Sequence, residues 1–237
     1  MTEREQRVAI ITGGSQGIGA GVVAGYRGLG WAVVANSLKI QPSDDPDVLT
    51  VAGDVADRAT AEQIVSQALG RFGRIDTLVN NAGIFLSKPF TDYTDADYAL
   101  MTSVNLAGFF SMTQRVIPEL LKGGGGHIVN ISATVADYAD SESPSVLAAL
   151  TKGGLAAATR SLAIEYASRG IRANAVAPGI IQTPMHPPEE YAGLGPQIPL
   201  GRVGQISDVV GAVLYLESAP YVTGVTLHID GGQLAGH

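Results

Sequence analysis

The stretch TGGSQGIG, Thr12–Gly19, decides the fold of this chain. It follows the apolar run Val8–Ile11, which predicts a short buried strand, and it precedes Ala20–Leu29, which has helical character. A strand, a glycine turn and a helix in this order bring free backbone N–H groups and the positive end of a helix dipole to one point. Such a point suits a phosphate or a pyrophosphate.

Three glycines of this stretch fit that interpretation. Gly13, Gly17 and Gly19 would supply the tight turn, the close backbone approach and the close helix–strand contact that a pyrophosphate site needs. Their spacing differs from the more familiar G-x-G-x-x-G pattern. Because a glycine cluster alone also fits an ordinary loop, the interpretation depends on the rest of the chain.

Length and composition are typical of a globular protein. With 237 residues, 46% hydrophobic and 16% charged, the chain can bury one large core, and we expect a single domain over residues 1–237. A net charge of −7 argues against nucleic acid as a partner. There is no cysteine, and the four histidines show no ligand spacing, so no metal site is expected. The polar start MTEREQR and the lack of a long apolar run predict a cytoplasmic protein with no membrane partner.

Short runs rich in Val and Ile alternate with longer helical patterns along the chain. The runs are continuously apolar, which predicts a doubly wound, Rossmann-type α/β fold whose parallel sheet has helices on both faces. The predicted strands are Val8–Ile11, Trp31–Ala35, Val48–Ala52, Thr77–Val79, His127–Ile131, Arg172–Ala177 and Val225–Ile229. The predicted helices are Ala20–Leu29, Arg58–Phe72, Asp95–Leu121, Pro144–Ser168 and Ile206–Ser218.

The stretch Gly179–Gly204 differs from this alternation, because it has several prolines and glycines, the pair Glu189–Glu190 and no clear period. A structureless loop of that length in a compact domain is usually functional, so we expect a lid or a substrate-binding segment. His186 lies in this stretch and is a candidate for substrate contact.

Further motifs point to one family. NNAG, Asn80–Gly83, follows the fourth predicted strand, and Asn105 lies in SVNLAGFF. PGIIQTP follows the sixth predicted strand, and VTGVTLHIDGG, Val222–Gly232, has the pattern of a last strand and its exit. Over nearly its whole length the chain resembles the short-chain dehydrogenase/reductase family, and the glycine spacing of Thr12–Gly19 is that family's form of the cofactor loop.

The resemblance implies a nicotinamide dinucleotide at the carboxyl ends of the strands. The glycine loop would hold the pyrophosphate, Asp54 would contact the adenine, and Asn81 and Ala82 would lie beside the adenosine ribose. Ile180 and Thr183 would lie beside the nicotinamide. The full predicted set is Gly13, Ser15, Gln16, Gly17, Ile18, Gly19, Asn36, Ser37, Lys39, Asp54, Val55, Asn81, Ala82, Gly83, Lys152, Pro178, Gly179, Ile180 and Thr183.

Residues at the end of the second predicted strand indicate whether the cofactor is NAD(H) or NADP(H). A carboxylate there would accept hydrogen bonds from a free ribose 2′-hydroxyl and repel a 2′-phosphate, and Ala35–Lys39 contains none. Asn36, Ser37 and Lys39 are compatible with a 2′-phosphate, so we expect NADP(H). Gln16 stands where the family usually has an arginine, which leaves NAD(H) possible.

The resemblance also implies a Tyr, a Lys four residues later on the same helical face, a Ser, and an Asn that supports a water feeding the Lys. The segment beginning TKGGLAAATRS aligns without a gap and makes Lys152 the lysine, and Asn105 is the asparagine. The Tyr position is then Ala148, and the Ser position falls at Ala133. A methyl group cannot replace a phenol as general acid.

Three interpretations remain. In the first, a neighbouring hydroxyl takes over, and we select Ser132; the other candidates are Thr134, Tyr138, Ser143 and Ser145. In the second, the substrate is an iminium, which is already cationic and needs only a hydride. In the third, the chain binds cofactor without turnover, as a regulatory or structural subunit.

We therefore expect a sheet with strand order 3-2-1-4-5-6-7 and an NADP(H)-dependent oxidoreductase with an unusual proton donor. Its substrate would be a small carbonyl, alcohol or imine compound. The predicted catalytic residues are Asn105, Ser132 and Lys152. The resemblance further implies a homotetramer, formed through the two long helices and the last strand.

Overall fold

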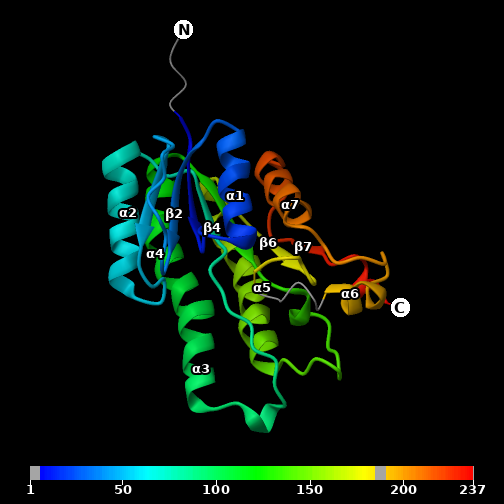
Figure 1. Ribbon diagram of the computed structural model, residues 1–237. Helices are drawn as coiled ribbons and strands as arrows, with labels where there is room; N and C mark the ends of the chain where they lie inside the picture. Colours follow the sequence, from blue (N-terminus) through cyan, green and yellow to red (C-terminus); the bar gives the residue numbers. More distant parts are fainter. Residues whose placement is uncertain (1–5, 185–190, 237) are drawn as a thin grey trace.

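The computed structural model describes residues 6–184 and 191–236. Parallel strands form one seven-stranded sheet with the order β3-β2-β1-β4-β5-β6-β7, which confirms the predicted topology (Figure 1). The order reverses between β1 and β4, and in such sheets ligands bind at this switch point, beyond the carboxyl ends of the strands. The strands are β1 (Val8–Thr12), β2 (Ala32–Ser37), β3 (Val48–Ala52), β4 (Thr77–Asn80), β5 (Gly126–Ile131), β6 (Ile171–Pro178) and β7 (Thr226–Ile229).

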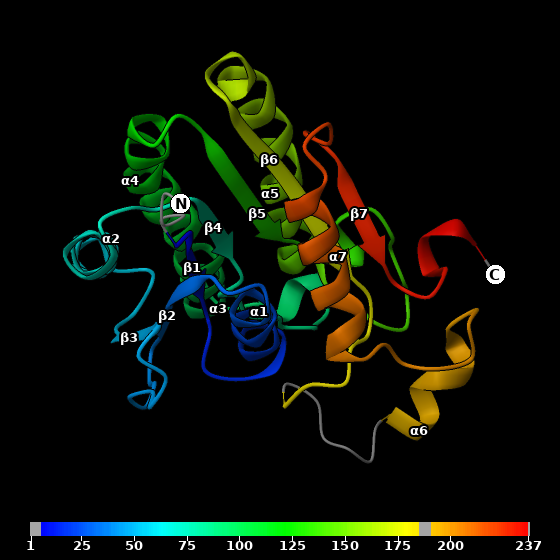
Figure 2. The same cartoon turned by 90° about the horizontal axis from the view of Figure 1, so that it is seen from above.

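Helices cover both faces of the sheet (Figure 2). On one face lie α1 (Gly17–Gly28) and α7 (Ile206–Ser218); on the other lie α2 (Arg58–Phe72), α4 (Phe109–Lys122) and α5 (Val146–Tyr166). Alternate strand residues point to opposite faces, so Ile10 packs under α2 and α4 while Ile11 packs under α1 and α7. Both are fully buried, which explains the continuously apolar strand sequences. None of the helices in the described part of the chain is long and apolar enough to cross a membrane.

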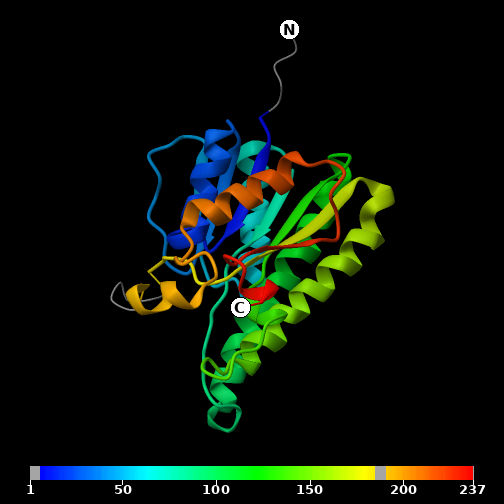
Figure 3. The same cartoon turned by 90° about the vertical axis from the view of Figure 1, so that its right-hand side faces the viewer.

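The predicted helix Asp95–Leu121 is wrong as a single regular helix. It consists of α3 (Asp95–Thr102), a π-helical turn over Ser103–Gly108, and α4. Figure 3 shows this rod beside α5, both extending past the carboxyl edge of the sheet. Gly108 ends the π turn in close contact with Val55, because a Cβ added to Gly108 would lie 2.9 Å from Val55 Cγ1. Single π turns inside α-helices often occur at functional sites.

The stretch after β6 is more regular than its sequence predicts. Ile181 forms a parallel bridge with Gly204, so the two ends of the segment between β6 and α7 are paired with each other. Between them, α6 (Tyr191–Leu194) is followed by a 3₁₀ turn over Gly195–Gln197, and the expectation of a structureless loop is wrong for these residues. His186 and the pair Glu189–Glu190 lie outside the described residues. Further 3₁₀ turns span Phe90–Asp92, Thr134–Ala136, Ala167–Arg169 and Gln233–Ala235.

A buried polar cluster lies at the amino edge of the sheet, away from the switch point. Glu217 of α7 accepts hydrogen bonds at its Oε2 from Tyr26 Oη at 2.8 Å and Thr77 Oγ1 at 2.9 Å, and His127 Nδ1 lies 3.0 Å from the same oxygen. On the other side of the ring, Asn174 Nδ2 lies 3.1 Å from His127 Nε2. This pattern requires a neutral His127 with its proton on Nδ1, because Nε2 must accept the hydrogen bond from Asn174.

Candidate active site

The glycine loop between β1 and α1 is shaped by contacts that exclude side chains. A Cβ added to Gly19 would collide with the carbonyl oxygen of Gly13 and lie 2.5 Å from Asn81 Nδ2. Gly13 has φ +68° and Gly17 has φ +55°, a region that favours glycine. The first turn of α1 therefore lies directly against the loop, with its free N–H groups facing the carboxyl edge of the sheet.

The NNAG segment after β4 supports this loop. The Asn81 side chain donates from Nδ2 to the carbonyl oxygens of Thr12 at 2.9 Å and Gly13 at 3.2 Å. In return, Thr12 Oγ1 accepts hydrogen bonds from the backbone N–H groups of Asn81 and Ala82, both at 3.0 Å. The residues predicted around the pyrophosphate and the adenosine ribose therefore form one connected unit at the switch point.

The end of β2 differs from the sequence-based expectation in one residue. Asn36 is 1% exposed, and its Nδ2 donates to the carbonyl oxygens of Val51 at 3.0 Å and Gly53 at 3.1 Å. These two bonds hold the side chain toward β3 rather than toward solvent. Its amide protons are thus engaged with backbone, and a direct contact of Asn36 with a 2′-phosphate is not supported by this geometry.

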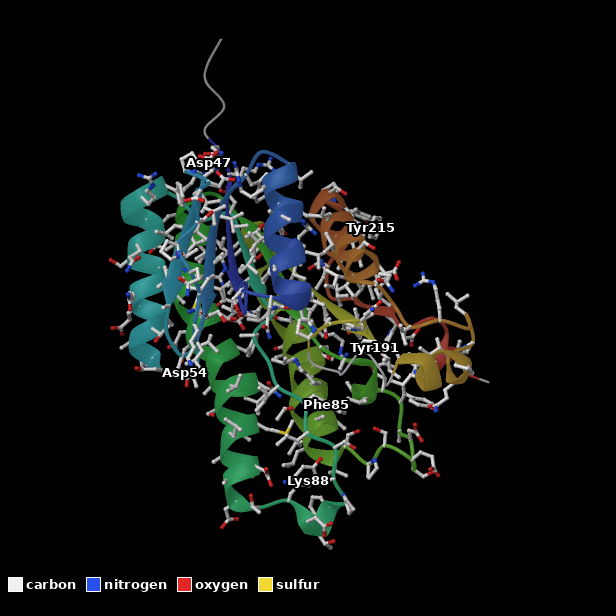
Figure 4. The ribbon with its side chains drawn as sticks, viewed as in Figure 1. Asp47, Asp54, Phe85, Lys88, Tyr191 and Tyr215 are labelled. Atoms are coloured by element: carbon white, nitrogen blue, oxygen red, sulfur yellow. The ribbon has the colours of Figure 1, made fainter. Side chains whose placement is uncertain are left out.

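Other residues near this end of β2 are better placed for a nucleotide. Ser15 Oγ of the glycine loop donates to Ser37 Oγ at 2.9 Å, so two hydroxyls meet between the loop and the strand end. Lys39 follows and is exposed. Asp54 lies at the carboxyl end of β3, where Figure 4 labels it, and its Oδ1 accepts from the backbone N–H of Ala56 at 2.9 Å. These groups border the place where the resemblance puts the adenosine.

Lys152 is a buried cation at the centre of the site. Its side chain extends from α5 to the end of β5, where Nζ donates to the carbonyl oxygen of Ile131 at 2.9 Å. A Cβ added to Gly83 would lie 2.8 Å from Nζ, so the NNAG glycine makes room for the amine. Burial lowers the pKa of Lys152 to about 8, because a desolvated ammonium is less stable than a solvated one.

Asn105 lies in the π turn between α3 and α4 and is buried. Its Oδ1 accepts from the backbone N–H of Ile84 at 2.9 Å, and its Nδ2 donates to the Ile84 carbonyl oxygen at 3.0 Å and to Thr151 Oγ1 at 3.1 Å. The side chain therefore connects the chain after NNAG to α5, one residue before Lys152. Asn105 and Lys152 are neighbours around Gly83, as the resemblance implies.

Ser132 is buried at the end of β5, and its Oγ donates to the main-chain carbonyl oxygen of Lys152 at 3.0 Å. This hydrogen bond links the end of β5 to α5. The catalytic role of Ser132 stays a prediction. Thr134 is similar, since its Oγ1 donates to the Ala177 carbonyl oxygen at 3.4 Å. Ala148 lies one turn before Lys152 on α5 and packs in an apolar cluster with Met101.

The residues after β6 complete the site. Gly179 fits tightly, since a Cβ there would lie 2.9 Å from Asp230 Cα. Thr183 lies against Gly17, and Tyr191 of α6 bonds to its backbone. Ile180 also lines a neighbouring cavity of about 580 Å³ between the 198–204 segment and the end of β7, which contains His228. His228 Nε2 lies 3.1 Å from Asp137 Oδ2, and no group of metal-ligating side chains occurs in the described residues.

Sequence reasoning missed two members of this site. The motif marks Thr12 only as the start of the glycine stretch, although its hydroxyl oxygen accepts hydrogen bonds from two backbone N–H groups. A threonine at the end of an apolar strand is the only signal for this role. No feature of the sequence predicts the role of Tyr191, because its partner Thr183 is eight residues away in a stretch with no helical or strand periodicity.

A doubly wound parallel sheet with a glycine loop at its switch point defines a Rossmann-type nucleotide-binding protein. A family model described as enoyl-(acyl carrier protein) reductase matches residues 13–233. 3-Oxoacyl-[acyl-carrier-protein] reductase FabG of Thermotoga maritima is 36% identical over 246 residues, covering 96% of this chain and 98% of that protein. The chain belongs to the short-chain dehydrogenase/reductase family of oxidoreductases.

Other relatives differ in the substrates that they are named for. The 2,5-dichloro-2,5-cyclohexadiene-1,4-diol dehydrogenase LinX of Sphingobium indicum is 33% identical, covering 97% of each chain. Among solved structures, ElxO with NADP bound has a TM-score of 0.90 at 30% identity, covering 98% of this chain and all of that one. The 3-ketoacyl-(acyl-carrier-protein) reductase of Brucella melitensis complexed with NADH has a TM-score of 0.88 at 30% identity, covering 97% and 99%.

Proposed function

We propose that this protein is an NADP(H)-dependent oxidoreductase that moves hydride between the nicotinamide and a small carbonyl, alcohol or imine compound. The observation that carries the proposal is the buried Lys152 ammonium at the carboxyl edge, next to Gly83 and Asn105. An ammonium has three N–H bonds, and the Ile131 carbonyl accepts one of them. Ribose hydroxyls at this edge are suitable acceptors for the others.

The described residues fit a dinucleotide. The close packing of Gly19 against the glycine loop brings the free N–H groups of α1 to the carboxyl edge, where they suit a pyrophosphate. Ser15 and Ser37 would lie on the adenosine side, with Thr183 on the nicotinamide side. The cofactor would supply or accept the hydride; the chain's residues would orient the reactants and move the proton.

For the proton, we propose the Lys152 ammonium. Its pKa, lowered to about 8 by burial, keeps it charged at neutral pH and close to the range in which general acids work best. Ala148, in the position of the family's Tyr, leaves no phenol between the amine and the substrate on this face of α5. The hydroxyls of Ser132 and Thr134 are engaged with backbone carbonyls, which makes them weaker candidates.

The preference for NADP(H) is supported by Lys39 and by the two hydroxyls at Ser15 and Ser37. Asn36 no longer contributes to this argument, because its amide binds β3. With no carboxylate in Ala35–Lys39, a 2′-phosphate meets no like charge there.

A second candidate is a subunit that binds cofactor without turnover. The apolar surroundings of Ala148 favour it, since Met101 and Leu147 cannot donate a proton and the Tyr93 hydroxyl packed nearby donates to the Leu86 carbonyl oxygen. Incubation of the purified protein with NADPH and a panel of ketones and cyclic imines separates the candidates. Oxidation of NADPH with ketones that is lost in Lys152→Met at saturating NADPH supports Lys152 as the acid. Oxidation with imines alone supports the iminium interpretation. Tight binding with no oxidation supports the subunit.

We also propose the homotetramer implied by the resemblance. Exposed apolar side chains on the outer faces of α4 and α5 support it, among them Phe110, Leu150 and Ile164. Tyr221 and Val225, which precede β7, are also exposed. Light scattering would give the mass of the assembly, and Ile164→Glu would be expected to reduce it if α5 packs against a second copy.

A further inference from the structure

Tyr191 makes a contact that the family motifs do not include. Its phenol oxygen accepts a hydrogen bond from the Thr183 backbone N–H at 3.0 Å and donates one to the Thr183 carbonyl oxygen at 2.6 Å. One side-chain atom thus satisfies both main-chain polar groups of Thr183. Since these two groups belong to successive peptide units, the phenol fixes the direction of the chain at this residue.

Thr183 in turn lies on the glycine loop. A Cβ added to Gly17 would be 3.6 Å from Thr183 Cβ and 3.7 Å from its Cγ2, which is ordinary van der Waals contact. Gly17 is the first residue of α1, so Thr183 lies against the helix end that would face the pyrophosphate. The preceding residue is anchored separately, because the Gln182 N–H donates to the Gly204 carbonyl oxygen at 2.9 Å.

We propose that Tyr191 is a positioning residue for the dinucleotide. Its phenol holds Thr183 against Gly17, and this link from α6 through Thr183 to the glycine loop raises the affinity of the site for the dinucleotide. The inference rests on the proposed function. Figure 4 shows Tyr191 between α6 and the carboxyl edge of the sheet, whereas Tyr215 lies on α7 away from that edge. Loss of the phenol removes two hydrogen bonds from the main chain of Thr183, the residue that lies against Gly17.

Tyr191→Phe tests the proposal, with Tyr215→Phe as the matched control because Tyr215 is exposed on α7. We would measure amide hydrogen exchange at Thr183 without cofactor, the Kd for NADPH by fluorescence, and the Tm with and without NADPH. Tyr191→Phe should speed exchange at Thr183 about tenfold and raise the Kd about 5- to 20-fold, as expected for one or two hydrogen bonds. The cofactor-free Tm should fall by only about 2–4 °C, and Tyr215→Phe should match the wild type.

The outcomes are distinct. Wild-type and Tyr191→Phe proteins that bind NADPH equally would overturn the positioning role and leave the proposed function intact. A lower cofactor-free Tm with an unchanged Kd would assign Tyr191 a structural role instead, which also overturns the inference. If the wild type binds no nicotinamide cofactor, the proposed function and this inference both fail, while exchange at Thr183 still reports on the contact itself.

Discussion

The ammonium of Lys152 donates a hydrogen bond to the carbonyl oxygen of Ile131 at 2.9 Å, so a cation is buried between α5 and the end of β5. Its side chain is 8% exposed, and burial lowers its pKa from 10.5 to about 8. A charge held in this way reduces the stability of the folded protein below pH 8. Functional sites often contain groups that lower the stability of the folded protein but are needed for activity.

Lys152→Met should therefore stabilise the cofactor-free protein at pH 7, by about 1–3 kcal/mol, and weaken cofactor binding. Because the folded pKa lies below the unfolded value, the difference from wild type should be full below pH 8 and vanish as pH approaches 10.5. Urea unfolding at several pH values would measure it. Lys122→Met is the control, since Lys122 is exposed and paired with Glu119; equal behaviour of the two variants would contradict the account.

Gly19→Ala should disrupt the glycine loop, because the added Cβ meets the Gly13 carbonyl oxygen and Asn81 Nδ2. We expect a loss of about 1–3 kcal/mol in stability, as for other overpacked sites, and loss of nucleotide binding. Gly28→Ala is the control on the same helix, since a Cβ there meets nothing within 4 Å. Thermal unfolding and a nucleotide titration would measure both, and a Gly19→Ala variant that binds like wild type would show that the loop is not the pyrophosphate site.

Much of this fold can be predicted from the sequence. Strands buried on both faces are continuously apolar, so their positions can be predicted from apolar runs. The bounds of β3, α2 and α7 match the predicted bounds to the residue. The break in Asp95–Leu121 could not be predicted, because Ser103–Gly108 contains no proline and its close contact, between Gly108 and Val55, joins residues far apart in the sequence. Local sequence carries no signal for such a tertiary contact.

The candidate site was predictable in position and less so in side-chain direction. The glycine loop, NNAG, Asn105 and Lys152 meet at one edge because parallel strands end there. The orientation of Asn36 toward β3 depends on hydrogen bonds to Val51 and Gly53, which are distant in sequence, and the predicted strand ends before Asn36. The partners of Ser132 and Tyr191 are main-chain groups of distant residues, which no motif encodes.

Lys39→Ala should weaken NADPH binding about 3- to 10-fold, a typical effect for one phosphate contact by a lysine in water. Binding of NADH to the same variant serves as the internal control, because it lacks the 2′-phosphate. Fluorescence titrations at low and physiological salt would measure both constants. Equal weakening of the two cofactors would mean that Lys39 does not contact the 2′-phosphate.

The cluster around Glu217 should make stability depend on pH. Burial lowers the pKa of His127, so the unfolded chain takes up a proton near the ordinary value of 6.5 while the folded protein does not. Burial by itself raises the pKa of Glu217, but hydrogen bonds from His127, Tyr26 and Thr77 outweigh it and lower the pKa below 4.5. The free energy of unfolding therefore decreases in acid, because the folded protein resists protonation of both groups more than the unfolded chain does.

We expect the free energy of unfolding to fall from pH 7 to pH 5, with His127 contributing up to about 1.4 kcal/mol per pH unit. His127→Gln removes the imidazole and should reduce this slope. Denaturant unfolding across that range would measure it, with His228→Gln as the control because His228 is part of no such buried cluster. An unchanged slope in His127→Gln would contradict the tautomer assigned to His127.

Isothermal titration calorimetry of the wild-type protein with NADP⁺, NADPH, NAD⁺ and NADH tests the central claim most directly, that a nicotinamide dinucleotide lies at the carboxyl edge against the amides of α1. We expect NADP⁺ and NADPH to bind with a micromolar or tighter Kd, NADH to bind more weakly, and Gly19→Ala to bind none of them. Absence of heat with all four compounds, and of any rise in Tm in their presence, would contradict it.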